Sequence, residues 1–248
     1  MSTSVPFPHQ GAPSRATDSL PARVAGVVHA PRATFTRVIE SPRWLGVLAL
    51  TTAVTFVSSA ALLETETGRL ALVDQWERTA IAFGQPVDDA RYAMFGRASE
   101  QGTAYAALAA LASGPLLVFG ISLLLFAVFN GMLHGAAQFR QVVAITAYAG
   151  VILALRQVVA APLDYARETL ASPATANLLF TTLDAASPLA RFLGVIDLFV
   201  VWWVSALAIG IAVLYRRRAR SLVLGFIGGY LAVAALLALV MAVAGGTA

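Results

Sequence analysis

The sequence contains no cysteine and no lysine, and only 12% of its residues are charged. Without cysteine the chain cannot form disulfides, cysteine-ligated metal sites or thiolate nucleophiles. The charged fraction is about half of what soluble domains usually carry, whereas 58% of the residues are apolar and the mean hydropathy is +0.76. This balance excludes an ordinary soluble domain and indicates an integral membrane protein, and we expect no nucleic-acid partner.

Long apolar runs recur along the chain, and no strand-like alternation competes with them. A helix that rises 1.5 Å per residue needs about 20 residues to cross about 30 Å of hydrocarbon. Five segments approach this length, at about 44–63, 104–129, 142–163, 189–214 and 221–244. The sequence therefore predicts an all-α fold, in which a bundle of five transmembrane helices forms one polytopic membrane domain over residues 44–244.

Three stretches outside the spans carry further patterns. Residues 1–20 are rich in Pro, Ser and Thr and are predicted to form a disordered tail. Residues 21–43 mix apolar residues with arginines, which predicts short amphipathic helices on an anionic lipid surface. The loop 64–102 has apolar residues at helical spacing, and Asp88 can cap a second short helix there. Packing of that loop against the outer membrane surface is the favoured interpretation, and covering the bundle is the alternative.

The arginines set the predicted orientation. Residues 1–43 carry five arginines against two acids, the connection 130–141 carries one arginine, and 216–220 carries four. These three parts fall on one side of a five-span chain, whereas the acidic connections 64–102 and 164–188 fall on the other. Because basic connections stay in the cytoplasm, we expect a cytoplasmic N-terminus, including the tail and the amphipathic segment, and a C-terminus outside.

The basic turn after the fourth span comprises Arg216, Arg217, Arg218 and Arg220. Besides orienting the chain, it is expected to contact anionic lipids at the cytoplasmic face. Arginine is used throughout in place of lysine, and the spans are rich in alanine, which is typical of a GC-rich bacterial genome. The expected location is therefore a bacterial inner (plasma) membrane.

Ionisable residues are scarce inside the predicted spans, so each is a candidate for function. Arg156 in the third span and Asp197 in the fourth lie at similar depth from the outer side, and we predict an interhelical ion pair between them. Removing one partner would strand a charge in low dielectric at a cost of about 3–5 kcal/mol, which favours a structural clip. A substrate or proton site, and charges that snorkel outward, are the alternatives. Arg191 lies on another helix face and is expected to snorkel to the interface.

No pattern typical of an enzyme or a metal site occurs in the sequence. His134 lies in a predicted inner turn, where a lone histidine indicates a hydrogen-bonding turn residue. Ser113 precedes Gly114 and Pro115, but it lacks a placed general base, so Pro115 is interpreted as a kink in the second span. His-Glu-x-x-His, Gly-x-Ser-x-Gly and P-loop patterns are absent. We predict no enzymatic activity, no catalytic residues, no cofactor and no metal.

Small residues at four-residue spacing mark expected contacts between helices, because they let backbones approach closely. They are Ala106, Ala110 and Gly114 in the second span and Ser221, Gly225 and Gly229 in the fifth. Packing within the chain is the favoured interpretation. A homodimer through Gly225 and Gly229 is the alternative.

Three stretches of the sequence resemble the Yip family of membrane proteins (Ypt-interacting proteins, with the YIP domain), including its bacterial members. They are HAPRATFTRVIESPRW before the first span, GMLHGAAQFRQVVAITAYAG leading into the third and SPLARFLGVIDLFVVWWVSALAIGIAVLYRRRARS across the fourth. The resemblance runs from about residue 28 to 240 and is most specific in the fourth span. It implies a five-span bundle with a cytoplasmic N-terminus, in agreement with the topology predicted from charge. The loop 64–102 is longer than the family pattern.

In eukaryotes the resembled family is associated with Golgi and endoplasmic-reticulum vesicle traffic and with Rab-type GTPases. Only the architecture and a membrane-organising or trafficking-like role through protein or lipid partners are carried over here, since fold-level analogy warrants no more. The partners could be anionic lipids, another membrane protein or a second copy of the chain. The alternative function is a small transporter or permease component that uses Arg156 and Asp197 in a polar cavity.

Overall fold

The computed structural model describes residues 19–168, 175, 193–194 and 196–244, and the elements within them are helices. The first six are α1 (Leu20–His29), α2 (Pro31–Glu40), α3 (Leu45–Leu63), α4 (Glu66–Ala82), α5 (Asp89–Ser99) and α6 (Gly102–Phe126). They continue with the π-helix η2 (Ala127–Met132), α7 (Phe139–Ala149), α8 (Val151–Arg167), α10 (Leu198–Leu214) and α11 (Ala219–Ala244). The predicted tail up to residue 18, the first residues of the predicted fourth span and Arg191 lie outside the described residues.

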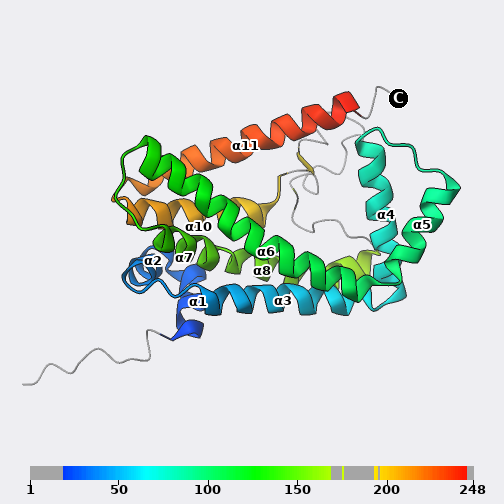
Figure 1. The fold of residues 1–248 in the computed structure, drawn as a ribbon, viewed down its shortest axis with the longest axis horizontal. Helices are drawn as coiled ribbons and strands as arrows, with labels where there is room; N and C mark the ends of the chain where they lie inside the picture. The colour runs from blue at the N-terminus through cyan, green and yellow to red at the C-terminus, as the bar shows by residue number, and fades with distance from the viewer. Residues whose placement is uncertain (1–18, 169–174, 176–192, 195, 245–248) are drawn as a thin grey trace, which may run out of the picture.

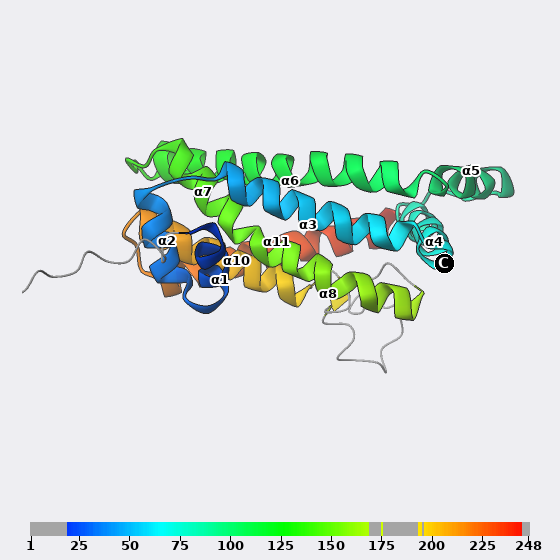
Figure 2. The same cartoon turned by 90° about the horizontal axis from the view of Figure 1, so that it is seen from below.

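Among the described residues, four helical segments are long and apolar enough to cross a membrane. They are Leu45–Leu63, Gly102–Met132, Phe139–Arg167 and Ala219–Val240. Together with α10 they run along the length of the molecule (Figures 1 and 2). The prediction of an all-α membrane protein is confirmed.

The predicted fourth span, 189–214, is wrong at its beginning. The helix α10 starts only at Leu198 and has 17 residues, because Asp197 adopts an extended conformation and caps it. At 1.5 Å per residue, α10 covers roughly 26 Å. It is apolar, but it is shorter than the four segments that meet the length of a span.

The two ends of the bundle differ in what they carry (Figure 1). One end holds α1, α2, the connection 133–138 and the turn 215–218 between α10 and α11, and we call it the basic end. The opposite end holds α4, α5 and the C-terminal part of α11, and we call it the far end. The basic connections therefore share one end, as the alternation of five spans requires. Which side of a membrane the basic end faces stays a prediction.

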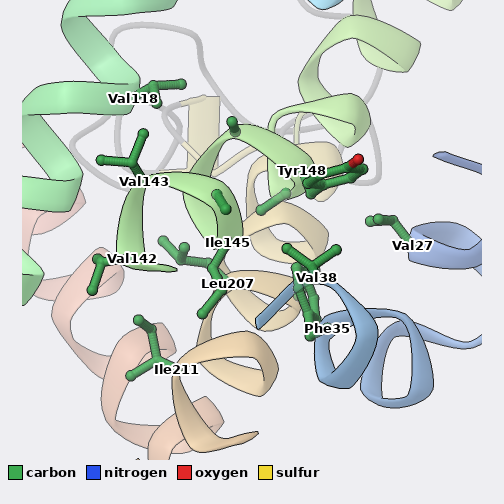
Figure 3. Close-up of a cluster of buried hydrophobic side chains, with 14 of the residues drawn as sticks. Val27, Phe35, Val38, Val118, Val142, Val143, Ile145, Tyr148, Leu207 and Ile211 are labelled. Atoms are coloured by element: carbon green, nitrogen blue, oxygen red, sulfur yellow. The ribbon is translucent and has the colours of Figure 1, made fainter. Parts of the chain in front are cut away.

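The third span, formed by α7 and α8, is the centre of the bundle. In its most apolar stretch of 18 residues, 61% of the residues are buried inside the protein. In the corresponding stretches of the other three segments the share is 11–17%, so most of their surface is left for lipid. All residues from Val142 to Ala149 are buried. The main apolar cluster, seen in Figure 3, gathers around them side chains from α1, α2, α6 and α10, among them Val27, Phe35, Val38, Val118, Leu207 and Ile211.

The helices α1 and α2 do not turn their apolar faces to a lipid surface, which corrects the expectation for residues 21–43. Val27, Phe35 and Val38 have no exposed surface, and α2 packs against α7 and α10. Gly210 on α10 makes this packing possible, since a Cβ there would overlap the Ile145 side chain and lie 3.2 Å from the Phe35 ring. The apolar side chains of these two helices are therefore covered by protein.

Arg23 is a second departure from the expectation of lipid-facing arginines in this segment. It is buried, and its Nη1 donates to the Ser41 carbonyl oxygen at 3.0 Å while Nη2 donates to the Ser41 hydroxyl oxygen. A buried guanidinium must be satisfied by acceptors. Arg23 therefore ties α1 to the residue that follows α2.

The long connection between α3 and α6 covers the far end of the bundle. Asp88 caps α5 as predicted, because its carboxylate accepts from the Arg91 amide at 2.8 Å. On α4, Leu72 packs with Leu63 and Ala106 in a separate buried cluster. Trp76 beside them makes edge-on contacts with aromatic rings of α5 and α6. Of the two arrangements expected for this loop, the structure supports covering the bundle.

Replacing Gly210 by leucine should lower the free energy of unfolding by about 1–3 kcal/mol, because the added side chain overpacks the contact among α2, α7 and α10. The measurement is thermal or denaturant unfolding of the purified protein in detergent. Gly120→Leu on α6 is the matched control, since no atom would lie within 4 Å of a Cβ there. An equal loss of stability in both variants would contradict the close packing at Gly210.

Candidate functional site

Asp197 joins three helices at the start of α10. Its side chain is almost fully buried, and its Oδ1 accepts hydrogen bonds from the amides of Phe199 at 2.8 Å and Val200 at 3.3 Å. Its Oδ2 lies 2.8 Å from Nε of Arg156 on α8. The Asp197 amide donates to the hydroxyl oxygen of Tyr230 on α11 at 3.1 Å. One acidic residue thus connects α8, α10 and α11.

The structure brings Arg156 and Asp197 together, but it places Asp197 at the beginning of a helix and not within one. The first amides of a helix have no partner inside the helix, and the helix dipole favours a negative charge there. The carboxylate therefore serves both the helix start and the guanidinium. An aspartate directly before an apolar run is a sequence signal for an N-cap, and the prediction of a longer fourth span missed it.

Arg156 also borders a cavity of about 220 Å³ between α3, α6 and α8, whose lining is mostly apolar. Its lining includes the polar residues Thr51, Thr52, Thr55, Ser113 and Gln157. The Arg156 side chain is 32% exposed against 6% for Asp197, which does not line the cavity. Ser113 meets no histidine or carboxylate in this lining.

Asp164, two turns after Arg156 on α8, is a buried acid that the sequence placed in a polar connection. It is buried, and its Oδ1 has no hydrogen-bond partner among the described residues. The predicted third span ended at residue 163, but α8 continues to Arg167. Asp164 therefore lies in the last turn of α8 and not in a loop.

The basic end contains a polar network that sequence analysis did not find. The Tyr215 hydroxyl donates to Asn130 Oδ1 at 2.6 Å, and Asn130 Nδ2 donates to the Ala137 carbonyl oxygen at 2.8 Å. The network connects the end of α10, the π-helix η2 and the connection after it. His134 lies in that connection with a φ of 53°. Its side chain makes no hydrogen bond to the described residues, and its predicted place in a turn is confirmed.

The two stripes of small residues behave differently. On α6, Ala106 and Ala110 are buried, and a Cβ at Gly114 would lie 3.3 Å from the Thr52 hydroxyl oxygen of α3. This stripe lies in the contact between α3 and α6. On α11, a Cβ at Gly225 or Gly229 would meet no described atom within 4 Å.

The preferred interpretation of Gly225 and Gly229, packing within the chain, is therefore wrong. The contact of α11 with the core instead uses larger side chains, namely Leu222, Phe226, Ile227 and Tyr230. These residues recur at helical spacing and form one face of α11. The two glycines lie on another face, and a homodimer through them stays a prediction.

The family model described as the Yip1 domain matches residues 25–243, from within α1 to the last turn of α11. A comparison with curated proteins gives no match, and a comparison with solved structures gives none.

Nothing in the described residues forms a group of three or more His, Asp or Glu side chains that could hold a metal ion.

A double-mutant cycle of Arg156→Gln and Asp197→Asn should show a coupling free energy of about 1–3 kcal/mol in unfolding experiments, because the ion pair is largely buried. Asparagine retains an oxygen for the amides of Phe199 and Val200. Asp197→Ala, which removes this oxygen, should therefore lower the free energy of unfolding by about 0.5–2 kcal/mol more than Asp197→Asn does. Additive single effects would contradict the pair, and equal losses in the two Asp197 variants would contradict the cap.

Proposed function

The chain belongs to the Yip1 domain family, and from this membership we propose that it organises the membrane by holding protein or lipid partners at its basic end. The observation that carries the proposal is the set of elements that meet at the basic end. Two amphipathic helices, the π-helix η2 and an arginine-rich turn meet there, and the arginines of the turn are exposed. Exposed arginines next to apolar surface are suited to contact lipid headgroups or an acidic partner.

The protein is integral to a membrane, and we propose that it lies in a bacterial inner (plasma) membrane with its basic end in the cytoplasm. The separation of charge supports this orientation, because the connections at the basic end are positive and those at the far end are acidic. The use of arginine without any lysine supports a bacterial source.

In this proposal the chain performs no chemistry and needs no cofactor. The Arg156–Asp197 ion pair supports a structural role, since Asp197 satisfies both Arg156 and the first amides of α10. The alternative of a small transporter gains no support from this geometry. Arg156 borders the cavity between α3, α6 and α8, but Asp197 does not.

Photo-crosslinking in native membranes tests the proposed use of the basic end. A photoreactive residue at the exposed position Ala136 should capture protein or lipid adducts, read by mass spectrometry, several-fold more often than one at the exposed position Tyr92 on α5. Both positions lie outside the four segments that can span the membrane. Equal capture at the two positions would contradict a working surface at the basic end.

A further inference from the structure

A cavity of about 690 Å³ opens at the basic end, between α2, the connection 133–138 and the turn after α10. Residues that line it include Thr36, Glu40, Phe129, His134, Arg216 and Arg217. A second hollow of about 430 Å³ adjoins it, shares Phe129, Leu133, Arg216 and Arg217, and adds Arg218 and Ser221. The two hollows together form what we call the basic cavity.

The charge of the basic cavity is positive. Three arginines line it, and Glu40, at the end of α2, is the one acid among its lining residues. Within the part of the chain that the structure describes, the guanidinium groups of Arg216, Arg217 and Arg218 make no hydrogen bond or ion pair. Guanidinium groups match phosphate oxygens in shape and charge, and such hydrogen bonds are among the stronger ones in proteins.

The backbone around the basic cavity is held in an uncommon conformation on two sides. Arg216 has a φ of 52° and His134 a φ of 53°, in the left-handed region that few residues other than glycine adopt. Each is followed by a backbone hydrogen bond, from the Arg217 amide to the Ala212 carbonyl oxygen at 2.9 Å and from the Gly135 amide to the Phe129 carbonyl oxygen at 2.8 Å. At Arg216 these contacts, with the Arg216 amide donating to the Val213 carbonyl oxygen, form the usual hydrogen-bond pattern of a helix C-terminus, so the chain turns sharply there and α10 ends at the basic cavity.

The packing of Gly135 fixes the two sides against each other. A Cβ at Gly135 would overlap the ring of Tyr215 and lie 2.7 Å from the Phe129 carbonyl oxygen. The Tyr215 hydroxyl is anchored to Asn130 in the π-helix η2, and π-helical turns occur often at functional sites. The turn that carries the arginines is therefore held in place by packing against the connection 133–138 and η2.

Apolar side chains stand beside the basic cavity. Leu133 lines it and is 49% exposed, and its neighbour Met132, the last residue of η2, is 73% exposed. A ligand with its charged group among the arginines could lay an apolar part along Leu123 and Leu124, which are also exposed on α6. This arrangement suits a membrane lipid better than a small soluble phosphate.

We propose that the basic cavity binds the phosphate group of an anionic ligand, with Arg216, Arg217 and Arg218 as its partners and a phospholipid headgroup as the favoured source. This deepens the proposed function, on which it rests, by assigning the lipid chemistry at the basic end. The two can fail separately. Crosslinked protein partners without headgroup selectivity would leave only the function standing, and selective headgroup binding without enriched crosslinking would leave only the site.

Native mass spectrometry of the purified full chain, offered equal amounts of phosphatidylglycerol and phosphatidylcholine, tests the site. The wild-type chain should retain phosphatidylglycerol preferentially, and Arg216→Gln with Arg217→Gln should lower this retention about tenfold or more, through loss of charge-assisted hydrogen bonds. Ala136→Trp, which fills the cavity without changing charge, should lower it as well. Glu40→Gln should not weaken binding, because it removes the opposing carboxylate.

The matched control is Arg43→Gln with Arg140→Gln, which removes the same charge from exposed arginines at the same end that do not line the basic cavity. Retention within about twofold of wild type in this control supports the site. An equal loss in both double variants would overturn it, since binding would then follow net charge alone. Unchanged retention in Arg216→Gln with Arg217→Gln, in protein with wild-type thermal stability, would overturn it too.

Competition with glycerol 3-phosphate and with inorganic phosphate identifies the source of the phosphate group. Displacement of phosphatidylglycerol only by other anionic lipids supports a headgroup site. Displacement by millimolar soluble phosphate, abolished in Arg216→Gln with Arg217→Gln, supports phosphate binding and assigns a soluble source.

Discussion

The carboxylate of Asp197 must be satisfied inside an otherwise apolar bundle, and much of the architecture follows from how this is done. Leaving one partner of a buried ion pair unmatched costs several kcal/mol, about 3–5 in typical cases. Here the carboxylate takes two amides of α10 and the guanidinium of Arg156, and the amide of the same residue reaches Tyr230. These contacts set where α10 begins and hold it to α8 and α11. A structural role is the one that this geometry supports.

Because α10 begins at Leu198, its 17 residues end at Leu214, and the arginine-rich turn follows at the basic end. The other end of the same helix is fixed just as closely. Phe35 of α2 fits against Gly210, and the Tyr215 ring packs against Gly135. The arginines are therefore positioned by helix packing that begins at Asp197 and ends in the polar network of Tyr215 and Asn130.

Two groups of arginines in the structure differ in their physics. Arg23 and Arg156 are enclosed or partly enclosed by protein and are matched to acceptors, so they contribute to the stability of the fold. Arg216, Arg217 and Arg218 are exposed and line a cavity. Exposed charges contribute little to stability, and they are free to bind an outside group. Net charge alone cannot separate these groups, since both consist of arginines beside apolar sequence.

The sequence by itself determined the class of the protein, because the lengths and composition of the apolar runs leave a helical membrane bundle as the solution. It also determined the cap at Asp88 and the choice of Arg156 and Asp197 as residues to examine together. Only the tertiary structure decided that α10 begins at Leu198, that Phe35 is enclosed by protein and that Gly225 faces outward. An apolar helix face packs equally well against lipid or protein, since both are apolar. Periodicity in the sequence therefore identifies an apolar helix face. Whether lipid or protein covers that face depends on how all the helices pack together, and so does any cavity at the helix ends.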